Sequence, residues 1–266
     1  MRIKRGEGKQ NLHFKNIFSH LISEVFKEAT LKNMKIAAEH GLISEVKWML
    51  DQKVVPDEEV IELASRNGHI EIVKLLLEIN ALIDTLAIRE AARNGQIEIV
   101  KLLSAANAPI DKFAIRGAAS NGHIEIVKLL LEVDAPISEE AITDAAAAGH
   151  IEMVKLLLAT NAPIDEEAIT GAAWNRNIKI VKLLLEINAP IDEEAIEYAA
   201  KDGYVDGVRL LLDNNAPIND GAISRAANYG YIEIVKLLLA ANAPIDKEAI
   251  TLASMNGHIE IVKLLM

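Results

Sequence analysis

Four histidines recur at a fixed spacing, and imidazole is the side chain in this sequence best suited to bind a metal ion. His69, His123, His150 and His258 each follow a glycine directly, and their positions differ by multiples of 27 residues. The ligands of one zinc ion lie about 2 Å from it, whereas successive layers of packed helices are roughly 8–10 Å apart. The spacing therefore favours a structural or solvent-facing role for these histidines, and we expect no metal site.

Adjacent carboxylates are the second feature that could support chemistry, because paired acids can serve as general acid and base. Glu139-Glu140 and Glu166-Glu167 are such pairs, but each lies where a helix is expected to begin, and acidic residues stabilise that end of a helix. The absence of Cys excludes thiolate metal sites and Cys nucleophiles. The sequence also contains no phosphate-binding loop, zinc-protease or serine-hydrolase motif. We therefore predict a protein without catalytic residues and without cofactors.

These side chains are positioned by a repeat of 27 residues that organises most of the chain. Eight glycines occupy the same place in successive copies, and Arg176 takes the place of the ninth. We call these places the turn positions: Gly41, Gly68, Gly95, Gly122, Gly149, Arg176, Gly203, Gly230 and Gly257. Around them the sequence approximates AAxNGHIEIVKLLLExNAPIDEEAI, without insertion or deletion. Self-similarity at such a period indicates stacked units of a solenoid.

Each repeat carries the signals of two helices. Asp165 can cap the first helix of its copy, and six equivalent residues can do the same in other copies. They are Asp84, Asp111, Ser138, Asp192, Asn219 and Asp246. The turn position ends the first helix, because glycine adopts the left-handed conformation easily, and an Asn or Asp such as Asn161 ends the second. The predicted fold is an all-α, right-handed-type solenoid of stacked helix–turn–helix hairpins.

Arg176 is the exception among the turn positions. A residue other than glycine in the left-handed conformation costs roughly 1–2 kcal/mol. We therefore expect Arg176→Gly to raise the stability of the protein, provided that the turn at this position is the same as in the other copies.

The repeat resembles the ankyrin repeat, and the segment LASMNGHIEIVKLL at residues 252–265 carries the resemblance clearly. An ankyrin repeat is about 33 residues long and opens its first helix with Thr-Pro-Leu-His. One copy here has Glu167-Ala168-Ile169-Thr170 at that place, and the shorter copies look like an ankyrin variant without the projecting β-turn finger. The resemblance implies a non-catalytic protein-interaction scaffold that binds its partner on the inner-helix, concave surface. It also implies that the recurring His ties adjacent turns together.

One face of the first helix varies from copy to copy and is the candidate binding surface. Counted back from the turn position, residues 8, 7, 4 and 3 are almost always Ala, Ile, Ala and Ala or Ser, whereas residues 9, 6, 5 and 2 vary. At 100° per residue these sets lie on opposite faces of the helix. We call the second set the variable stripe and expect it to be free of packing contacts. With the turn residue Arg176 added, the candidate partner-binding residues are Arg66, Arg89, Arg93, Phe113, Arg116, Trp174, Arg176, Tyr198, Lys201, Arg225, Asn228 and Met255.

Three unusual residues coincide in one copy. Trp174 lies on the variable stripe, Arg176 replaces glycine, and Lys179 stands where most other copies have Glu. Arg and aromatic residues are enriched among the side chains that contribute most to protein interfaces. We therefore expect residues 174–228 to form the centre of the contact with a protein partner.

The composition divides the chain into three parts. Residues 1–10 are basic and are expected to form a mobile arm, residues 11–28 have the apolar spacing of an N-terminal capping helix, and residues 29–266 form the array of nine copies, the last one truncated. Because terminal repeats normally need a polar cap and the last copy has none, we expect a monomer or a weak dimer through that end. No apolar run reaches the roughly 18 residues of a membrane span, so we predict no membrane contact and a cytoplasmic or otherwise intracellular protein.

Two other functions remain open from the sequence. One is a nucleic-acid-binding helical array that uses the Arg-rich N-terminal half, with Arg66, Arg89, Arg93 and Arg116; the net charge of −11 counts against it, because nucleic acid is itself anionic. The other is an adaptor that docks an enzyme through residues 1–35. A protein-binding scaffold is the preferred interpretation, and nucleic acid is an unlikely partner.

Overall fold

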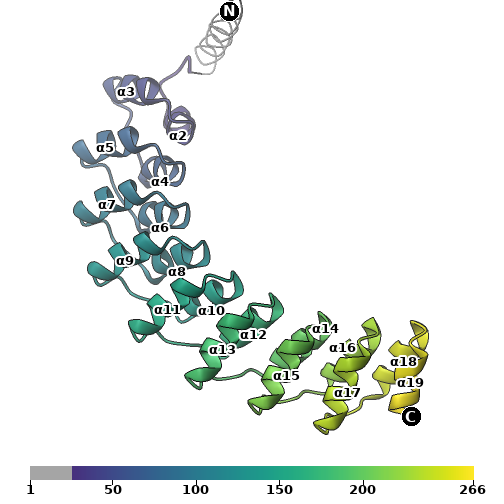
Figure 1. The fold of residues 1–266 in the computed structure, drawn as a ribbon. Helices are drawn as coiled ribbons and strands as arrows, with labels where there is room; N and C mark the ends of the chain where they lie inside the picture. Colours follow the sequence, from purple (N-terminus) through teal and green to yellow (C-terminus); the bar gives the residue numbers. More distant parts are fainter. Residues whose placement is uncertain (1–25) are drawn as a thin grey trace, which may run out of the picture. The chain divides into compact units, whose positions relative to one another are not determined.

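The computed structural model describes residues 26–266, which form helices joined by turns and loops and contain no strand. The arm expected at residues 1–10, and the capping helix expected at residues 11–28 up to Val25, lie outside the described residues. The chain divides into two compact units, one up to Ile110 and one from Asp111 onward. Each unit consists of helical hairpins stacked side by side (Figure 1).

The described part of the first unit contains three hairpins, and the second unit contains six. The helices of the first unit are α2 (Leu31–Glu39), α3 (Ile43–Asp51), α4 (Glu58–Arg66), α5 (Ile70–Glu78), α6 (Thr85–Arg93) and α7 (Ile97–Ala105). Those of the second unit are α8 (Lys112–Ser120), α9 (Ile124–Glu132), α10 (Glu140–Ala147), α11 (Ile151–Ala159), α12 (Glu167–Trp174), α13 (Ile178–Glu186), α14 (Ala195–Lys201), α15 (Val205–Asp213), α16 (Gly221–Tyr229), α17 (Ile232–Ala240), α18 (Lys247–Met255) and α19 (Ile259–Leu265).

Most of the predicted capping residues accept hydrogen bonds at the start of a first helix. The Asp84 carboxylate accepts from the backbone N–H groups of Leu86 and Ala87 at 2.9 and 3.3 Å, and four other aspartates accept in the same way. They are Asp111, Asp165, Asp192 and Asp246. The prediction is wrong for Ser138 and Asn219, whose side chains donate instead to the carboxylates of Glu140 and Glu197.

The turn positions adopt the left-handed conformation that the repeat predicts. Every turn glycine has a positive φ, between 68° and 82°, and Arg176 keeps the same geometry with φ 58°. The Asn and Asp residues that end the second helices also have a positive φ, for example 54° at Asn107 and 55° at Asn161. The turn at Arg176 is therefore not rebuilt to avoid the cost of a side chain there.

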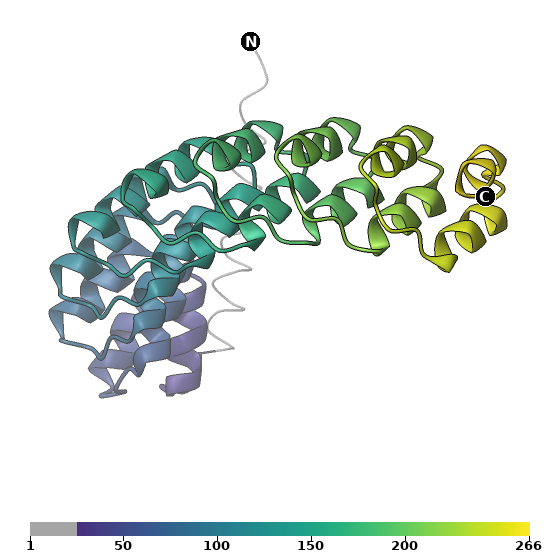
Figure 2. The ribbon, with the colours of Figure 1, turned by 90° about the horizontal axis from the view of Figure 1, so that it is seen from below.

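The core of each unit lies between the two helices of each hairpin and between neighbouring hairpins. First helices pack on first helices and second helices on second helices within each unit, which produces two rows (Figure 2). The constant Ala and Ile residues of the first helices, such as Ala168 and Ile169, are completely buried. In the second helix α5, Ile72 and Leu76 are no more than 1% exposed. Full burial of each such Ile or Leu contributes about 1.5–3 kcal/mol. Each unit is thus a solenoid of helix–turn–helix hairpins, as predicted.

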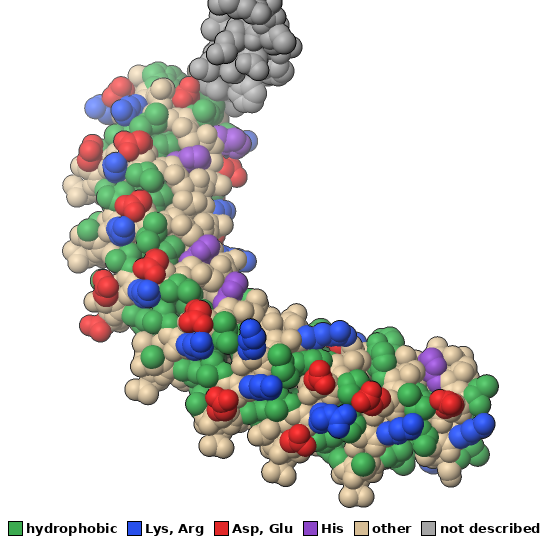
Figure 3. Space-filling model, viewed as in Figure 1, with side chains coloured by type: hydrophobic (Ala, Val, Ile, Leu, Met, Phe, Trp, Pro, Cys, Tyr) green, Lys and Arg blue, Asp and Glu red, His purple; other side chains and the backbone are tan. Residues whose placement is uncertain are grey.

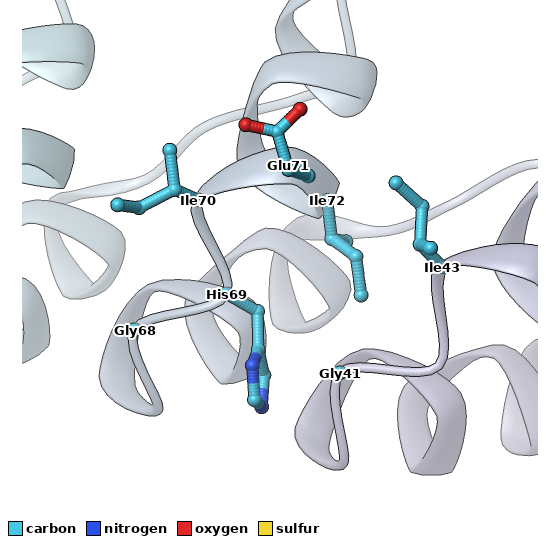
Figure 4. Close-up of a pocket in the computed structure, with 7 residues that line it drawn as sticks. All are labelled: Gly41, Ile43, Gly68, His69, Ile70, Glu71 and Ile72. Atoms are coloured by element: carbon cyan, nitrogen blue, oxygen red, sulfur yellow. The ribbon is translucent and has the colours of Figure 1, made fainter.

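The turn glycine also makes room for the residue that follows the next turn. A Cβ added to Gly41 would lie only 2.7 Å from the His69 ring, and the His69 Nε2 atom is 2.9 Å from the backbone carbonyl oxygen of Glu39. Figure 4 shows this ring lying between the two turns, at the edge of a pocket of about 400 Å³. His258 makes the equivalent contact with the Asn228 carbonyl at 3.2 Å. The tie between adjacent turns that the resemblance implied is present at both places.

Candidate functional site

The variable stripe is less free of contacts than the sequence suggested. Glu167 and Trp174 of α12 are exposed, in agreement with the prediction. Thr170 and Ser224, however, are only 6% and 5% exposed, and Leu63 is 8% exposed. The expectation that the whole stripe lacks packing contacts is therefore wrong at these positions.

Two hydroxyl side chains that lie six residues before a turn position, those of Thr143 and Ser224, link neighbouring copies. The Thr143 hydroxyl donates to the carboxylate of Asp165, which caps the first helix of the following copy. Ser224 donates in the same way to Asp246. These two hydroxyls therefore connect a first helix to the capping Asp of the next one and support the array.

In the first unit, the predicted residue Arg66 is held by two carboxylates. Its guanidinium lies 2.5 Å from Glu62 within α4 and 3.0 Å from Glu90 on α6. Burial raises the pKa of Glu62 above its usual value, although the charge of Arg66 acts in the opposite direction. Arg89 is half-buried and Arg93 is exposed on α6. Arg66 is thus a link between two first helices, with its charge largely compensated.

The second unit repeats this arrangement at two other predicted arginines. The Arg116 guanidinium lies 2.6 Å from Asp144 and 3.3 Å from Glu140 on the next first helix, and Arg225 lies 2.8 Å from Glu197 on the preceding one. These hydrogen bonds with carboxylates raise the pKa of both guanidinium groups. The stripe arginines of this unit therefore pair with neighbouring copies, which leaves less positive charge for an anionic ligand.

Three predicted residues come together on α12 and α14. The rings of Trp174 and Tyr198 are stacked, with centroids 4.6 Å apart and an angle of 9° between their planes. The Lys201 ammonium lies 5.6 Å from the centroid of the indole. Tyr198 is itself held by a hydrogen bond with Glu194, which raises the pKa of the phenol. The indole remains 46% exposed, so the cluster is both ordered by its neighbours and open to solvent.

Arg176 forms a hydrogen bond at the C-terminal end of α14, next to Lys201. Its guanidinium donates a hydrogen bond to the backbone carbonyl of Asp202, the residue that follows Lys201. This bond runs from one copy to the next, whereas the contacts of His69 and His258 run to the preceding copy. Arg176 is exposed, and its Cβ occupies the space that a turn glycine leaves for the next copy.

Two residues that the sequence analysis missed complete this junction. Tyr204 stands where the recurring His is expected, and its ring packs beside Gly207, where a Cβ would lie only 2.2 Å from Tyr204 Cδ1. The equivalent residue in neighbouring copies is a buried Ile, such as Ile180 or Ile234. The signal was present as two departures from the consensus, a Tyr after the turn glycine and a Gly in place of Ile.

The remaining predicted residues of the second unit are separate from the Trp174 cluster. Phe113 is 39% exposed, with the Lys112 ammonium 5.6 Å from its centroid. The Asn228 side chain accepts a hydrogen bond of 3.0 Å from Asn256, and Met255 is 77% exposed. They lie on the first helices α8, α16 and α18, whereas the aromatic stack joins α12 and α14.

Two classes of site find no support in the described part of the chain. Within residues 26–266, no group of three or more His, Cys, Asp or Glu side chains is arranged to hold a metal ion. None of the helices in that range combines the length and apolar character that a membrane span requires.

Comparison with known proteins identifies the family. The family model described as ankyrin repeats (3 copies) matches residues 34–114, 88–167, 115–195 and 144–222, which together cover more than half of the chain. No curated protein matches the chain significantly. The matched region includes α12, α14 and the Trp174 cluster. On the evidence of this match and of the stacked helical hairpins, the chain belongs to the ankyrin repeat family.

Proposed function

We propose that this protein is a non-catalytic scaffold that binds a protein partner through the variable stripe of its second unit, with residues 174–228 at the centre. Ankyrin repeats are in general protein–protein interaction modules. The observation that carries the choice of surface is the Trp174 indole, which is 46% exposed although it is stacked on Tyr198.

An ordered and exposed indole suits binding for a thermodynamic reason. A side chain that becomes fixed only on binding loses conformational entropy, which costs about 0.5–1.5 kcal/mol. The Tyr198 stack already restrains Trp174 in the free protein, so less of this entropy is lost when a partner contacts the ring. Aromatic and Arg side chains often supply most of the binding energy of an interface, and this cluster places Trp174, Tyr198 and Arg176 around adjoining helices.

Affinity capture with a matched pair of Trp variants tests the proposal. Trp174→Ala should remove proteins that the wild type captures, with a loss of about 2 kcal/mol or more for a direct partner. Trp48→Ala is the control, because Trp48 is 38% exposed but lies on the second helix α3, away from the variable stripe. A partner captured equally by all three proteins would show that the surface around Trp174 is not the binding site.

The two alternatives from the sequence are less well supported. The pairing of Arg66 and Arg116 with carboxylates weakens the case for nucleic-acid binding through the Arg-rich N-terminal half. Most of the segment 1–35 lies outside the described residues, so the enzyme adaptor stays a prediction, to be tested by deleting that segment.

A further inference from the structure

The second helices of four successive copies, α5, α7, α9 and α11, carry a regular ladder of ion pairs, and this ladder ends at α13. In four copies a Lys pairs with the Glu three residues before it, at 2.7–2.9 Å. These pairs are Lys74–Glu71, Lys101–Glu98, Lys128–Glu125 and Lys155–Glu152. In α13 the Glu is replaced by Lys179, so Lys182 faces a like charge. Figure 3 shows acidic and basic side chains interspersed along the surface where such pairs form.

Four cations in the Trp174 copy and the copy that follows it make no ion pair with a carboxylate of residues 26–266. Lys179 and Lys182 make no ion pair there, Lys201 lies over the indole, and Arg176 bonds to a backbone carbonyl. Arg176 lies in the turn between α12 and α13, and Lys179 lies in the first turn of α13. Lys201 thus lies over an exposed indole, Arg176 lies two residues after it, and Lys179 follows Arg176 in the first turn of α13, in a chain whose net charge is −11.

Charge complementarity indicates the chemistry of the partner. We infer that the partner contributes an acidic peptide segment, with an aromatic or aliphatic side chain that packs on Trp174 and carboxylates that meet Arg176, Lys179 and Lys201. This inference rests on the proposed function, since it describes the ligand of the same surface. Interfaces with complementary charge gain specificity and association rate, and the uncompensated cations supply the positive side.

A nucleic acid would also present anionic groups and flat rings, but the surroundings favour a peptide. Backbone phosphates form a continuous line of negative charge, whereas the cations here are confined to one copy and its border. Asp202 and Asp206 follow Lys201 in the next copy, Glu197 lies on α14, and Glu194, directly before α14, is hydrogen-bonded to Tyr198. A short acidic segment can end before Asp202 and Asp206, and a longer polyanion would be repelled by them.

Fluorescence of Trp174 in the full chain provides the assay. The chain has two Trp residues, so Trp48→Phe leaves Trp174 as the only indole. The probes are three peptides of equal length with a central Phe, flanked by Glu, by Ser or by Lys, and a thymidine oligonucleotide of similar length. The Glu peptide should bind at least about fivefold more tightly than the Ser peptide, with affinity that falls as salt increases.

Lys179→Glu tests the charges without disturbing the fold, because it restores the residue found in most other copies. It should weaken binding of the Glu peptide about threefold or more and leave the melting temperature equal or higher. Lys236→Glu makes the same charge change on α17 and should have little effect. Equal affinity for the Glu and Ser peptides, tighter binding of the Lys peptide or oligonucleotide, or an unchanged Lys179→Glu variant would overturn the inference. Loss of a captured protein partner in Trp174→Ala would still support the proposed function.

Discussion

Gly207→Ile should destabilise the wild-type protein but stabilise a variant that also carries Arg176→Gly and Tyr204→His. In the wild type the Tyr204 ring occupies the space where a Cβ of residue 207 would lie, with a closest approach of 2.2 Å. The added side chain must displace this ring, and overpacking of this kind costs about 1–3 kcal/mol.

In the background with Arg176→Gly and Tyr204→His, Gly207→Ile should raise the stability, because this background has a turn glycine and a following His, as other copies of the repeat have. A turn glycine at position 176 would accept the introduced imidazole, as Gly41 accepts the ring of His69. The space beside position 207 would then be open for the added Ile, which contributes about 1.5–3 kcal/mol when buried. The effect of Gly207→Ile should therefore differ by roughly 2.5–6 kcal/mol between the two backgrounds.

Arg176→Gly alone is the necessary third measurement. Glycine adopts the left-handed conformation without strain, which raises the free energy of unfolding by about 1–2 kcal/mol. The hydrogen bond from Arg176 to the Asp202 carbonyl is lost, however, and this lowers it by about 1 kcal/mol. We therefore expect a net change within about 1 kcal/mol, in place of the clear gain that the sequence alone predicted.

Urea denaturation followed by circular dichroism, applied to the single and combined variants, measures the coupling. The reasoning is refuted if Gly207→Ile changes the free energy of unfolding equally in both backgrounds, to within about 0.5 kcal/mol. Equal effects would mean that the Tyr204 ring does not compete for this space.

Three other expectations can be measured directly. A hydrogen bond from Ser138 lowers the pKa of Glu140. The ionised Glu140 therefore stabilises the fold above its usual pKa of 4.5, and this stabilisation is lost as the pH falls through the lowered value. In Ser138→Ala, the Glu140 pKa measured by NMR titration should return towards 4.5. Gly230→Ala should destabilise more than Gly257→Ala, because both glycines have positive φ but only Gly230 has a neighbouring side chain within reach of an added Cβ; equal changes in melting temperature would leave backbone strain as the whole cause. Trp174→Ala should cost about 0.5–1.5 kcal/mol of stability through the lost ring stack, and a much larger loss would identify Trp174 as a core residue.

The repeat period predicted most of the fold because each helix boundary depends on local chemistry. A capping Asp such as Asp84, and a turn residue such as Gly41 or Asn161, act within a few residues of their own position, and their roles were predicted correctly. The buried face of the first helices also followed from helical geometry, as the complete burial of Ala168 shows.

Contacts between copies were not predictable in the same way. The sequence placed Trp174 and Tyr198 on one stripe, but their stacking depends on the distance between neighbouring first helices, which a one-dimensional pattern does not contain. The pairing of Arg116 with Asp144 depends on the same distance. To predict that the Tyr204 ring packs at Gly207, one must know that a turn residue faces the residue 28 positions later. Only the structure reveals that relation.

The contact between a turn residue and the following copy has a consequence for how such a chain can change by recombination. A copy that ends its first helix with glycine can be followed by any copy that carries His at the contacting position, so these units are exchangeable by duplication or deletion. Arg176 breaks this freedom, because its Cβ fills the space that the incoming His requires. The copy that contains Arg176 and the copy that contains Tyr204 and Gly207 must therefore be inherited as one block of two repeats, and the Trp174–Tyr198 stack is inherited with them.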